Sequence, residues 1–264
     1  MVPTEQDYRS VIRAVSGDIE SLSSGARENI FSLTLSGSLV RGDFRAGSSD
    51  IDIHLVLRGT IPDPQASDDF CQVRDVIRRR VEAIEHANGL RTIVDLVCMC
   101  LARLPGLGDG TVNPAIKMLS FYRFDLQAHH EVLWGEDFAS KLPPGPAPRS
   151  MVVDRLASSL RRAEQIVHDS AQRFRAGMLA VEAVKAIQLL FADPPSIHKA
   201  DVSRVYRDVV PDFPGKADGW RVWNEYLAGK PIPQDLATCA RLIEFLRNVL
   251  SAAVECDGRP DVLG

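Results

Sequence analysis

The 264-residue sequence predicts an α+β fold, in which a domain built on a mixed β-sheet is followed by a mainly α-helical bundle. The order strand, turn, strand, helix, strand within about 70 residues of the N-terminal half predicts the sheet domain. The segment KLPPGPAPR at 141–149 is rich in proline and glycine, which is typical of a domain boundary. Beyond it, apolar residues recur at helical spacing. We therefore expect a first domain over 1–145 and a helical domain over 150–264.

The N-terminal elements alternate between helical and strand patterns. Apolar residues at spacings of three and four predict an amphipathic helix over 4–22. Residues 30–35 and 50–57 are rich in Ile, Leu and Val and predict two strands. Gly37 marks a sharp turn after the first strand. The connection between the strands, which contains Arg41, is expected to be a loop or a helical turn.

Further elements complete each domain. Apolar residues on one helical face over 69–88 predict a long helix that ends at Asn88-Gly89. A third strand is expected from 91 to about 100. In the second half, the apolar periodicity predicts two helices within 150–192 and another over 235–256.

The composition is that of a soluble globular protein, and a cytoplasmic location is the expectation. Hydrophobic residues make up 45% of the chain and charged residues 25%. The N-terminal segment lacks the apolar run of a signal peptide, and no stretch is long enough to span a membrane. Five cysteines without a CxxC motif indicate reduced structural thiols rather than a zinc site. The formal charge of -4 argues against a nucleic-acid partner.

Two closely spaced acids in the second strand have the pattern of metal ligands. Because side chains alternate along a strand, Asp50 and Asp52 would share one face, while the isoleucines that follow each of them point into the core. Carboxylates this close repel each other unless a divalent cation neutralises them, and hard oxygen ligands suit Mg²⁺. Upstream, the turn Gly37-Ser38 offers backbone N–H groups and a hydroxyl to phosphate oxygens.

A third acid lies in a later apolar strand. Asp95 stands in the run TIVDLV, and its strand is expected next to that of Asp52. Burying a carboxylate there without a partner would cost free energy. We therefore expect Asp95 to bind the metal or to act as the general base for an acceptor hydroxyl. His54 would share the face of the two earlier acids and is expected to be a buried, hydrogen-bonded histidine.

Each of these features also has an ordinary structural explanation. A Gly-Ser turn is common, an Asp-x-Asp pair can cap a strand or belong to a loop, and Asp95 could pair with an arginine. Arg41 follows the turn closely enough to reach a phosphate, but a salt bridge to Asp43 is an equal alternative. The combination of turn, paired acids and third acid, in this order, favours a catalytic site.

These residues resemble the signature of the nucleotidyltransferase superfamily typified by DNA polymerase beta, which is Gly-Ser, a short spacer, Asp-hydrophobic-Asp and a later acid on another strand. The resemblance covers residues 30–100. It implies that Gly37-Ser38 binds the β- and γ-phosphates of a nucleoside triphosphate. It further implies that two Mg²⁺ ions are held by a set of three acids, namely Asp50, Asp52 and Asp95. Arg41 and Ser49 are additional nucleotide-binding candidates by the same resemblance.

The second half resembles the helical domain of the streptomycin/spectinomycin adenylyltransferases of aminoglycoside resistance. That resemblance rests on Lys185, Lys199 and Tyr226, and it implies that these residues meet the nucleotide across the cleft between the domains. Two departures separate the chain from those enzymes. The run Gln172-Arg173-Phe174-Arg175 stands where they present acidic residues to a cationic antibiotic, and Asp95 stands where they use glutamate. We therefore expect this chain to catalyse the same reaction as those enzymes, but we do not expect the same acceptor.

The resemblance implies an enzyme that transfers a nucleoside monophosphate to a hydroxyl of a small-molecule acceptor and releases pyrophosphate. The expected donor is ATP or another nucleoside triphosphate, because no residue is seen to read the base. Two alternatives stay open at this point. The chain could nucleotidylate a protein or a transfer RNA, or it could bind nucleotides without catalysis. The sequence decides neither the acceptor nor the oligomeric state.

Overall fold

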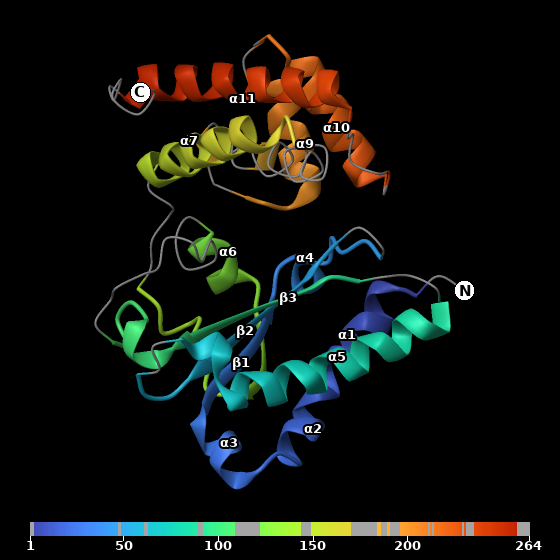
Figure 1. The fold of residues 1–264 in the computed structure, drawn as a ribbon, viewed down its shortest axis with the longest axis vertical. Helices are drawn as coiled ribbons and strands as arrows, with labels where there is room; N and C mark the ends of the chain where they lie inside the picture. Colours follow the sequence, from blue (N-terminus) through green and yellow to red (C-terminus); the bar gives the residue numbers. More distant parts are fainter. Residues whose placement is uncertain are drawn as a thin grey trace. The chain divides into compact units, whose positions relative to one another are not determined.

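The computed structural model describes residues 3–46, 49–60, 63–88, 92–108, 122–143, 149–169, 184–185, 189–190, 196–210, 212, 214–228, 230 and 235–257 (Figure 1). The chain divides into two compact units, Met1–Gly145 and Pro146–Gly264. The first unit contains a β-sheet with helices, and the described elements of the second unit are helices. The α+β fold predicted from the sequence is confirmed.

The sheet of the first unit has four strands in the order β3-β2-β1-β4. Their bounds are β1 (Ile30–Ser36), β2 (Ile51–Leu57), β3 (Val94–Cys100) and β4 (Glu131–Gly135). β1 pairs antiparallel with both β2 and β4, whereas β2 and β3 run parallel. The parallel pair is joined through α5 (Asp68–Asn88), as a parallel connection requires a crossover. The sheet is therefore mixed, as predicted.

Three helices cover one face of this sheet, namely α1 (Glu5–Arg13), α2 (Val15–Glu20) and α5 (Figure 1). The single helix expected over 4–22 was wrong in its continuity, because the chain leaves α1 at Ala14 and begins α2 directly afterwards. The apolar side chains remain buried although the helix is interrupted. Of the side chains that predicted one continuous stripe, Val11 is partly buried and the others are fully buried, namely Tyr8, Ile12, Val15 and Ile19.

Short elements connect these larger ones. They are α3 (Ser24–Asn29), α4 (Ser38–Arg41), the 3₁₀ turns η1 (Pro64–Ala66) and η2 (Leu101–Arg103), and α6 (Arg123–Ala128). α4 is the helical turn expected between the first two strands. The long helix expected over 69–88 is confirmed, and the third strand begins at Val94 rather than at residue 91.

The two faces of the sheet differ in chemistry because side chains alternate along each strand. One face carries the buried apolar residues that pack against α1, α2 and α5, which are Leu33, Leu35, Ile51, Ile53, Leu55 and Leu57. The opposite face carries a second apolar cluster that includes Val56, Met99, Leu126 and Phe138. The strands β1 and β2 also carry polar side chains on this face, namely Ser32, Thr34, Ser36, Asp52 and His54.

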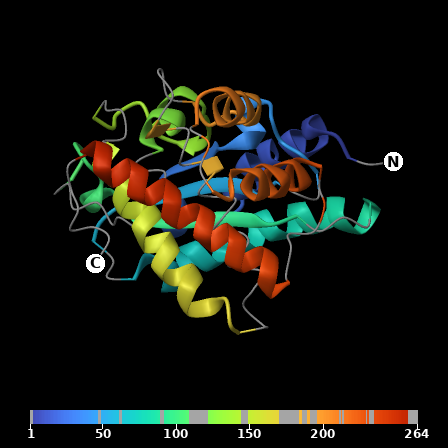
Figure 2. The ribbon, with the colours of Figure 1, turned by 90° about the horizontal axis from the view of Figure 1, so that it is seen from above.

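The second unit is helical in every described element. It contains α7 (Arg149–Ile166), α9 (Lys199–Asp208), α10 (Lys216–Leu227) and α11 (Leu236–Asp257). α7 and α11 lie side by side (Figures 1 and 2), and α10 also contacts α11. The helix expected over 235–256 is confirmed, as is the first of the two expected within 150–192. Most of the second lies outside the described residues. Among the described helices, none is long and apolar enough to cross a membrane.

Two isoleucines of the first unit, Ile53 in β2 and Ile93 directly before β3, test where the core of the sheet lies. Ile53 is fully buried, so Ile53→Ala should lower the free energy of unfolding by about 3 kcal/mol through lost burial and a residual cavity. Ile93 is 66% exposed, so Ile93→Ala should change it by less than about 0.5 kcal/mol. Urea unfolding of both variants would measure this. Equal losses would mean that the core does not lie on the face of Ile53.

Candidate active site

Asp52 lies at the centre of the candidate site because its neighbours on both adjacent strands are polar. In the antiparallel register it stands opposite Ser36 of β1, and in the parallel register it stands opposite Asp95 of β3. Neighbouring strands are about 4.8 Å apart, so these three side chains start from adjacent positions in the sheet. The expectation that the strand of Asp95 neighbours the strand of Asp52 is therefore confirmed.

Gly37 touches the Asp52 carboxylate. Its φ of 73° is a conformation that other residues rarely adopt. A Cβ added at this position would also collide with the Asp52 carboxyl group. Glycine is required here for two independent reasons, and the turn after β1 packs directly against the acid of β2. The structure thus brings the Gly-Ser turn and the Asp-x-Asp motif together.

The other two acids are more exposed than Asp52. Asp50 comes directly before β2 and is exposed, while Ile51 and Ile53 are fully buried. The expected core positions of the isoleucines are therefore confirmed. Asp95 is also exposed, which corrects the expectation that its strand would bury it. The exposure means that Asp95 needs no buried partner to offset a desolvation cost.

The carboxylates fit Mg²⁺ in chemistry, although they do not form a complete cage. Among the described residues, no group of three or more His, Cys, Asp and Glu side chains is close enough to hold a metal ion. Mg²⁺ does not require such a cage, because it retains several waters and is usually bound by one or two carboxylates together with substrate phosphates. Asp52 and Asp95, paired in register at the end of the sheet, supply that smaller number.

Ser38 begins α4 and has a buried side chain with 5% exposure. Its hydroxyl oxygen has no hydrogen-bond partner within the part of the chain that the structure describes. A buried hydroxyl without a partner costs free energy, so a ligand oxygen near it would be stabilising. This observation agrees with the phosphate-binding role that the sequence predicts for the Gly37-Ser38 turn.

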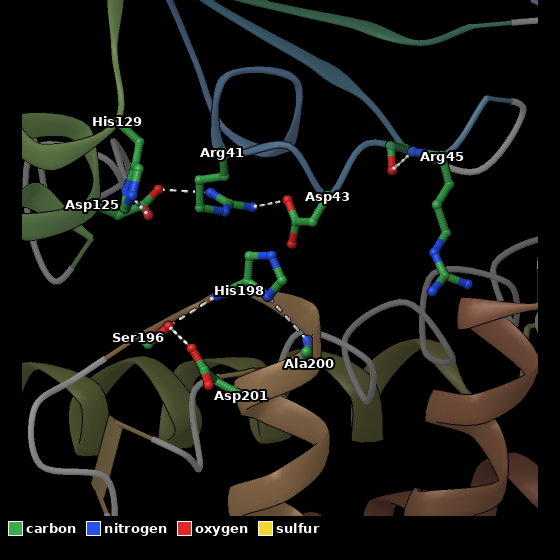
Figure 3. A network of polar contacts seen from close by, with 10 residues as sticks. Arg41, Asp43, Arg45, Asp125, His129, Ser196, His198, Ala200 and Asp201 are labelled. Carbon is green, nitrogen blue, oxygen red and sulfur yellow. Dashed lines mark hydrogen bonds and ion pairs between the residues drawn. The ribbon is translucent and has the colours of Figure 1, made fainter. Parts of the chain in front are cut away.

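Arg41 ends α4 and is held between two carboxylates (Figure 3). Its Nη1 atom donates to Asp125 Oδ2 over 2.7 Å, and its Nη2 atom lies 3.3 Å from Asp43 Oδ1. The salt bridge to Asp43, one of the two alternatives weighed from the sequence, is present. The Nε atom is buried without a partner among the described residues, so its N–H is a donor available to a ligand. The predicted phosphate contact of Arg41 stays a prediction.

Asp125 is the residue of this network that the sequence did not reveal. It lies on α6, 84 positions from Arg41, and its side chain is 2% exposed. Burial raises the pKa of its carboxyl group, while Arg41 and His129 act in the opposite direction. The His129 Nδ1 atom lies 3.1 Å from the second oxygen of Asp125 (Figure 3). Nothing in the local sequence around Asp125 marks it, because the partner comes from a distant element.

Ser49 is buried in the connection that leads into β2. The backbone N–H of Arg45 donates to the Ser49 hydroxyl over 3.0 Å, and the Ser49 N–H donates to the Arg45 carbonyl over 2.8 Å. These two bonds close the loop before Asp50. The contacts show a structural role for Ser49, and its predicted contact with nucleotide stays a prediction.

His54 is fully buried, as expected. Its Nε2 atom is hydrogen-bonded to the Ser36 hydroxyl at 2.9 Å. Burial lowers the pKa of His54 to about 4. In a protonated ring both nitrogens carry an N–H group, and Nδ1 has no partner among the described residues. The imidazole is therefore neutral near pH 7, directly beside the serine that neighbours Asp52.

The three candidates from the second unit can be placed within that unit. The Lys185 Nζ atom lies 5.7 Å from the centre of the Tyr226 ring, which is within the range of a cation–π interaction. Lys199 is the first residue of α9 and is buried, with 6% exposure. The structure thus brings Lys185 and Tyr226 together. Gln172-Arg173-Phe174-Arg175, the run that departs from the antibiotic enzymes, lies outside the described residues.

A polar cap precedes Lys199 at the start of α9 (Figure 3). The His198 Nδ1 atom accepts from the N–H of Ala200 over 3.3 Å, and Ser196 donates to Asp201 over 2.7 Å. The Ser196 hydroxyl also accepts from the backbone N–H of His198. The cap fixes where the helix begins, and hence the backbone position of Lys199.

The buried neutral His54 predicts a pH dependence of stability. Because the folded pKa of about 4 lies below the ordinary 6.5, only the unfolded chain takes up this proton between those values. Stability is fully present above pH 6.5 and is lost as the pH falls toward 4. Between pH 7 and pH 5 the loss should be about 2 kcal/mol.

Urea unfolding of the protein in EDTA at both pH values would measure this loss. The substitution His54→Gln should remove most of the pH dependence. His86→Gln, which changes an exposed histidine of α5, serves as the control and should retain it. The same pH dependence in both variants would contradict the assignment.

Comparison with protein-family models finds no match, and neither does comparison with curated protein sequences. Among solved structures, the fold is similar to that of the spectinomycin adenyltransferase AAD(9) from Enterococcus faecialis, which was crystallised with ATP and spectinomycin. The TM-score is 0.60 at 14% sequence identity, and the match covers 89% of this chain and 98% of that chain. At this identity the likeness is one of fold. It is the fold that the resemblance of the Gly-Ser, Asp-x-Asp and Asp95 motifs implied.

Proposed function

We propose that the protein is a Mg²⁺-dependent nucleotidyltransferase that moves AMP from ATP to a hydroxyl of a small-molecule acceptor and releases pyrophosphate. One observation carries the proposal. The Asp52 carboxylate stands in register beside Asp95 and against the glycine of the Gly37-Ser38 turn. Metal ligands and a phosphate-binding turn are the two components that phosphoryl transfer needs within a few ångströms of each other.

The three acids would have two roles, which are binding the metal ions and activating the acceptor hydroxyl. Asp50 and Asp52 would bridge two Mg²⁺ ions, and Asp95 would hold one of them or accept the proton of the acceptor hydroxyl. When bound, Mg²⁺ would offset the charge of the triphosphate and polarise the α-phosphate. The exposure of Asp95 supports the second role, because a general base must be within reach of an incoming substrate.

The triphosphate would be held by groups from both units. Gly37 offers its backbone, and Ser38 offers a buried hydroxyl that has no other partner among the described residues. Arg41 and Ser49 are proposed as further contacts of the first unit. From the second unit, Lys185 and Lys199 would offset the charge of the departing pyrophosphate, and Tyr226, already in contact with Lys185, would approach the nucleotide.

The structural neighbour supports ATP as the donor, because its crystal structure contains ATP. We propose the cytoplasm as the place of action, and an acceptor that is not a polycation. A basic run at 172–175 would repel a cationic antibiotic rather than attract it. The formal charge of -4 likewise argues against a transfer RNA acceptor.

Calorimetric titration with ATP in the presence and absence of Mg²⁺ tests the donor and the metal together. Binding should require Mg²⁺, and Asp52→Asn should weaken it at least about tenfold because one ligand to the metal loses its charge. Asp75→Asn, which alters an exposed acid of α5, is the matched control and should bind as the unaltered protein does. Binding of ATP that is equally tight without Mg²⁺ would contradict the proposal.

Turnover separates the enzyme from a nucleotide-binding protein. Pyrophosphate release should appear when acceptors that carry hydroxyl groups are screened with Mg²⁺ and ATP. Tight, Mg²⁺-dependent binding of ATP without release for any acceptor class, proteins and transfer RNA included, would leave a non-catalytic binding protein.

The contact between Gly37 and Asp52 gives a second prediction. Gly37→Ala should displace the carboxylate and strain the backbone, so Mg²⁺-dependent ATP binding should be lost and stability should fall by about 1–3 kcal/mol. Gly17→Ala, in α2 with open space around its Cβ position, should instead stabilise the protein by about 0.5–1 kcal/mol and leave binding unchanged. Calorimetry with urea unfolding measures both. Intact ATP binding in Gly37→Ala would remove this contact from the site.

A further inference from the structure

The turn proposed to bind phosphate has little structure of its own to hold it. α4 spans only Ser38–Arg41, and the glycine before it, Gly37, makes no side-chain cap. A helix of four residues is far too short to be stable in isolation. Its position must therefore come from contacts with other elements. Leu39, which is fully buried in the main core, holds one side of it.

The C-terminal end of α4 is held by the Arg41 ion pairs (Figure 3). Arg41 donates to Asp125 of α6 over 2.7 Å and lies 3.3 Å from Asp43. All three side chains are at most 8% exposed, so water does not compete for these contacts. The guanidinium of Arg41 is planar and has fixed donor directions. Two acceptors, one on α6 and one in the connection after α4, fix its orientation more firmly than one.

The charges of this network argue against a purely phosphate-binding role for Arg41. Two carboxyl groups already surround the guanidinium, so a phosphate would compete with them for its N–H groups. Each terminal nitrogen already engages a carboxyl group, and the Nε N–H has no partner among the described residues. The Arg41–Asp125 ion pair is a buried contact that links α6 to the end of α4.

We infer that Asp125 is a positioning residue, which acts through Arg41 to hold the Gly37-Ser38 turn against Asp52. The expected effect on ligand binding, which is tighter binding of Mg²⁺ and ATP, rests on the proposed function. The expected effect on the position of the turn does not require a nucleotide. Asp43 follows Arg41 by two residues, so Asp125 is the partner that ties the end of α4 to α6. Removing it leaves the buried guanidinium with Asp43 alone, and the end of α4 is released from α6.

Amide hydrogen exchange of the nucleotide-free protein tests the structural part. Asp125→Asn should raise the exchange rate of the backbone amides over 38–43, while amides in the centre of β1 and in α5 keep their rates. Asp18→Asn is the matched control, because it removes an arginine ion pair between α2 and α5, with Arg80, and leaves α4 untouched. It should leave exchange over 38–43 unchanged. Unchanged exchange in Asp125→Asn would overturn the inference.

Calorimetry with Mg²⁺ and ATP tests the consequence. Asp125→Asn should weaken binding about tenfold, within the usual range for coupling between neighbouring elements, and Asp18→Asn should not. If Asp125 acts through Arg41, then Asp125→Asn should have no further effect when Arg41→Met is already present. Independent, additive losses would mean that Asp125 acts by another route and would overturn the inference.

The hydrogen-exchange and calorimetry experiments together distinguish a failure of this inference from a failure of the proposed function. If the unaltered protein binds no ATP, the proposed function fails, and the exchange experiment alone decides whether Asp125 holds the turn. If ATP binding weakens in Asp125→Asn while exchange over 38–43 does not change, Arg41 is a phosphate ligand held by Asp125, and the positioning inference is overturned.

Discussion

The close packing of Gly37 against the Asp52 carboxylate is the constraint on which the candidate site depends. It requires that β1 end where β2 begins, which the antiparallel pairing of Ser36 with Asp52 achieves. It also requires a residue without a side chain in a left-handed conformation, which only glycine supplies without strain. Once these two conditions hold, the turn lies against Asp52, and contacts of Leu39 and Arg41 hold the α4 that follows it.

The sheet performs two different tasks on its two faces. Apolar side chains on the helix-covered face provide the burial that stabilises the first unit. The other face contains buried hydroxyls and an imidazole that satisfy one another, as Ser32 does with Thr34 and Ser36 with His54. Such pairs keep polar groups inside the protein at low cost. Neutral polar side chains of the sheet therefore lie next to Asp52 on this face.

The sequence predicted the features that depend on local pattern. The strand of Asp52, the turn at Gly37 and the long helix α5 follow from alternation, glycine and apolar periodicity, which are properties of neighbouring residues. The prediction of one helix over 4–22 was wrong because tertiary packing determines its continuity. The helix breaks at Ala14 although the apolar stripe continues. The sequence also did not reveal Asp125, because no local rule links an acid to an arginine 84 residues away. The exposure of Asp95 depends on what covers its strand, and the sequence of that strand does not contain this information.

The parallel pairing of β2 with β3 has a consequence for how the protein is made. Parallel neighbours cannot be joined by a hairpin, so α5 must be synthesised between them, and Asp95 leaves the ribosome long after Asp52. Gly37, Ser36 and Asp52 can meet in an early hairpin, whereas the third acid arrives only with the crossover. The proposed set of three metal-binding acids would therefore be completed late during translation. A nascent chain that ends before β3 would expose the edge of β2 together with an incomplete set of acids.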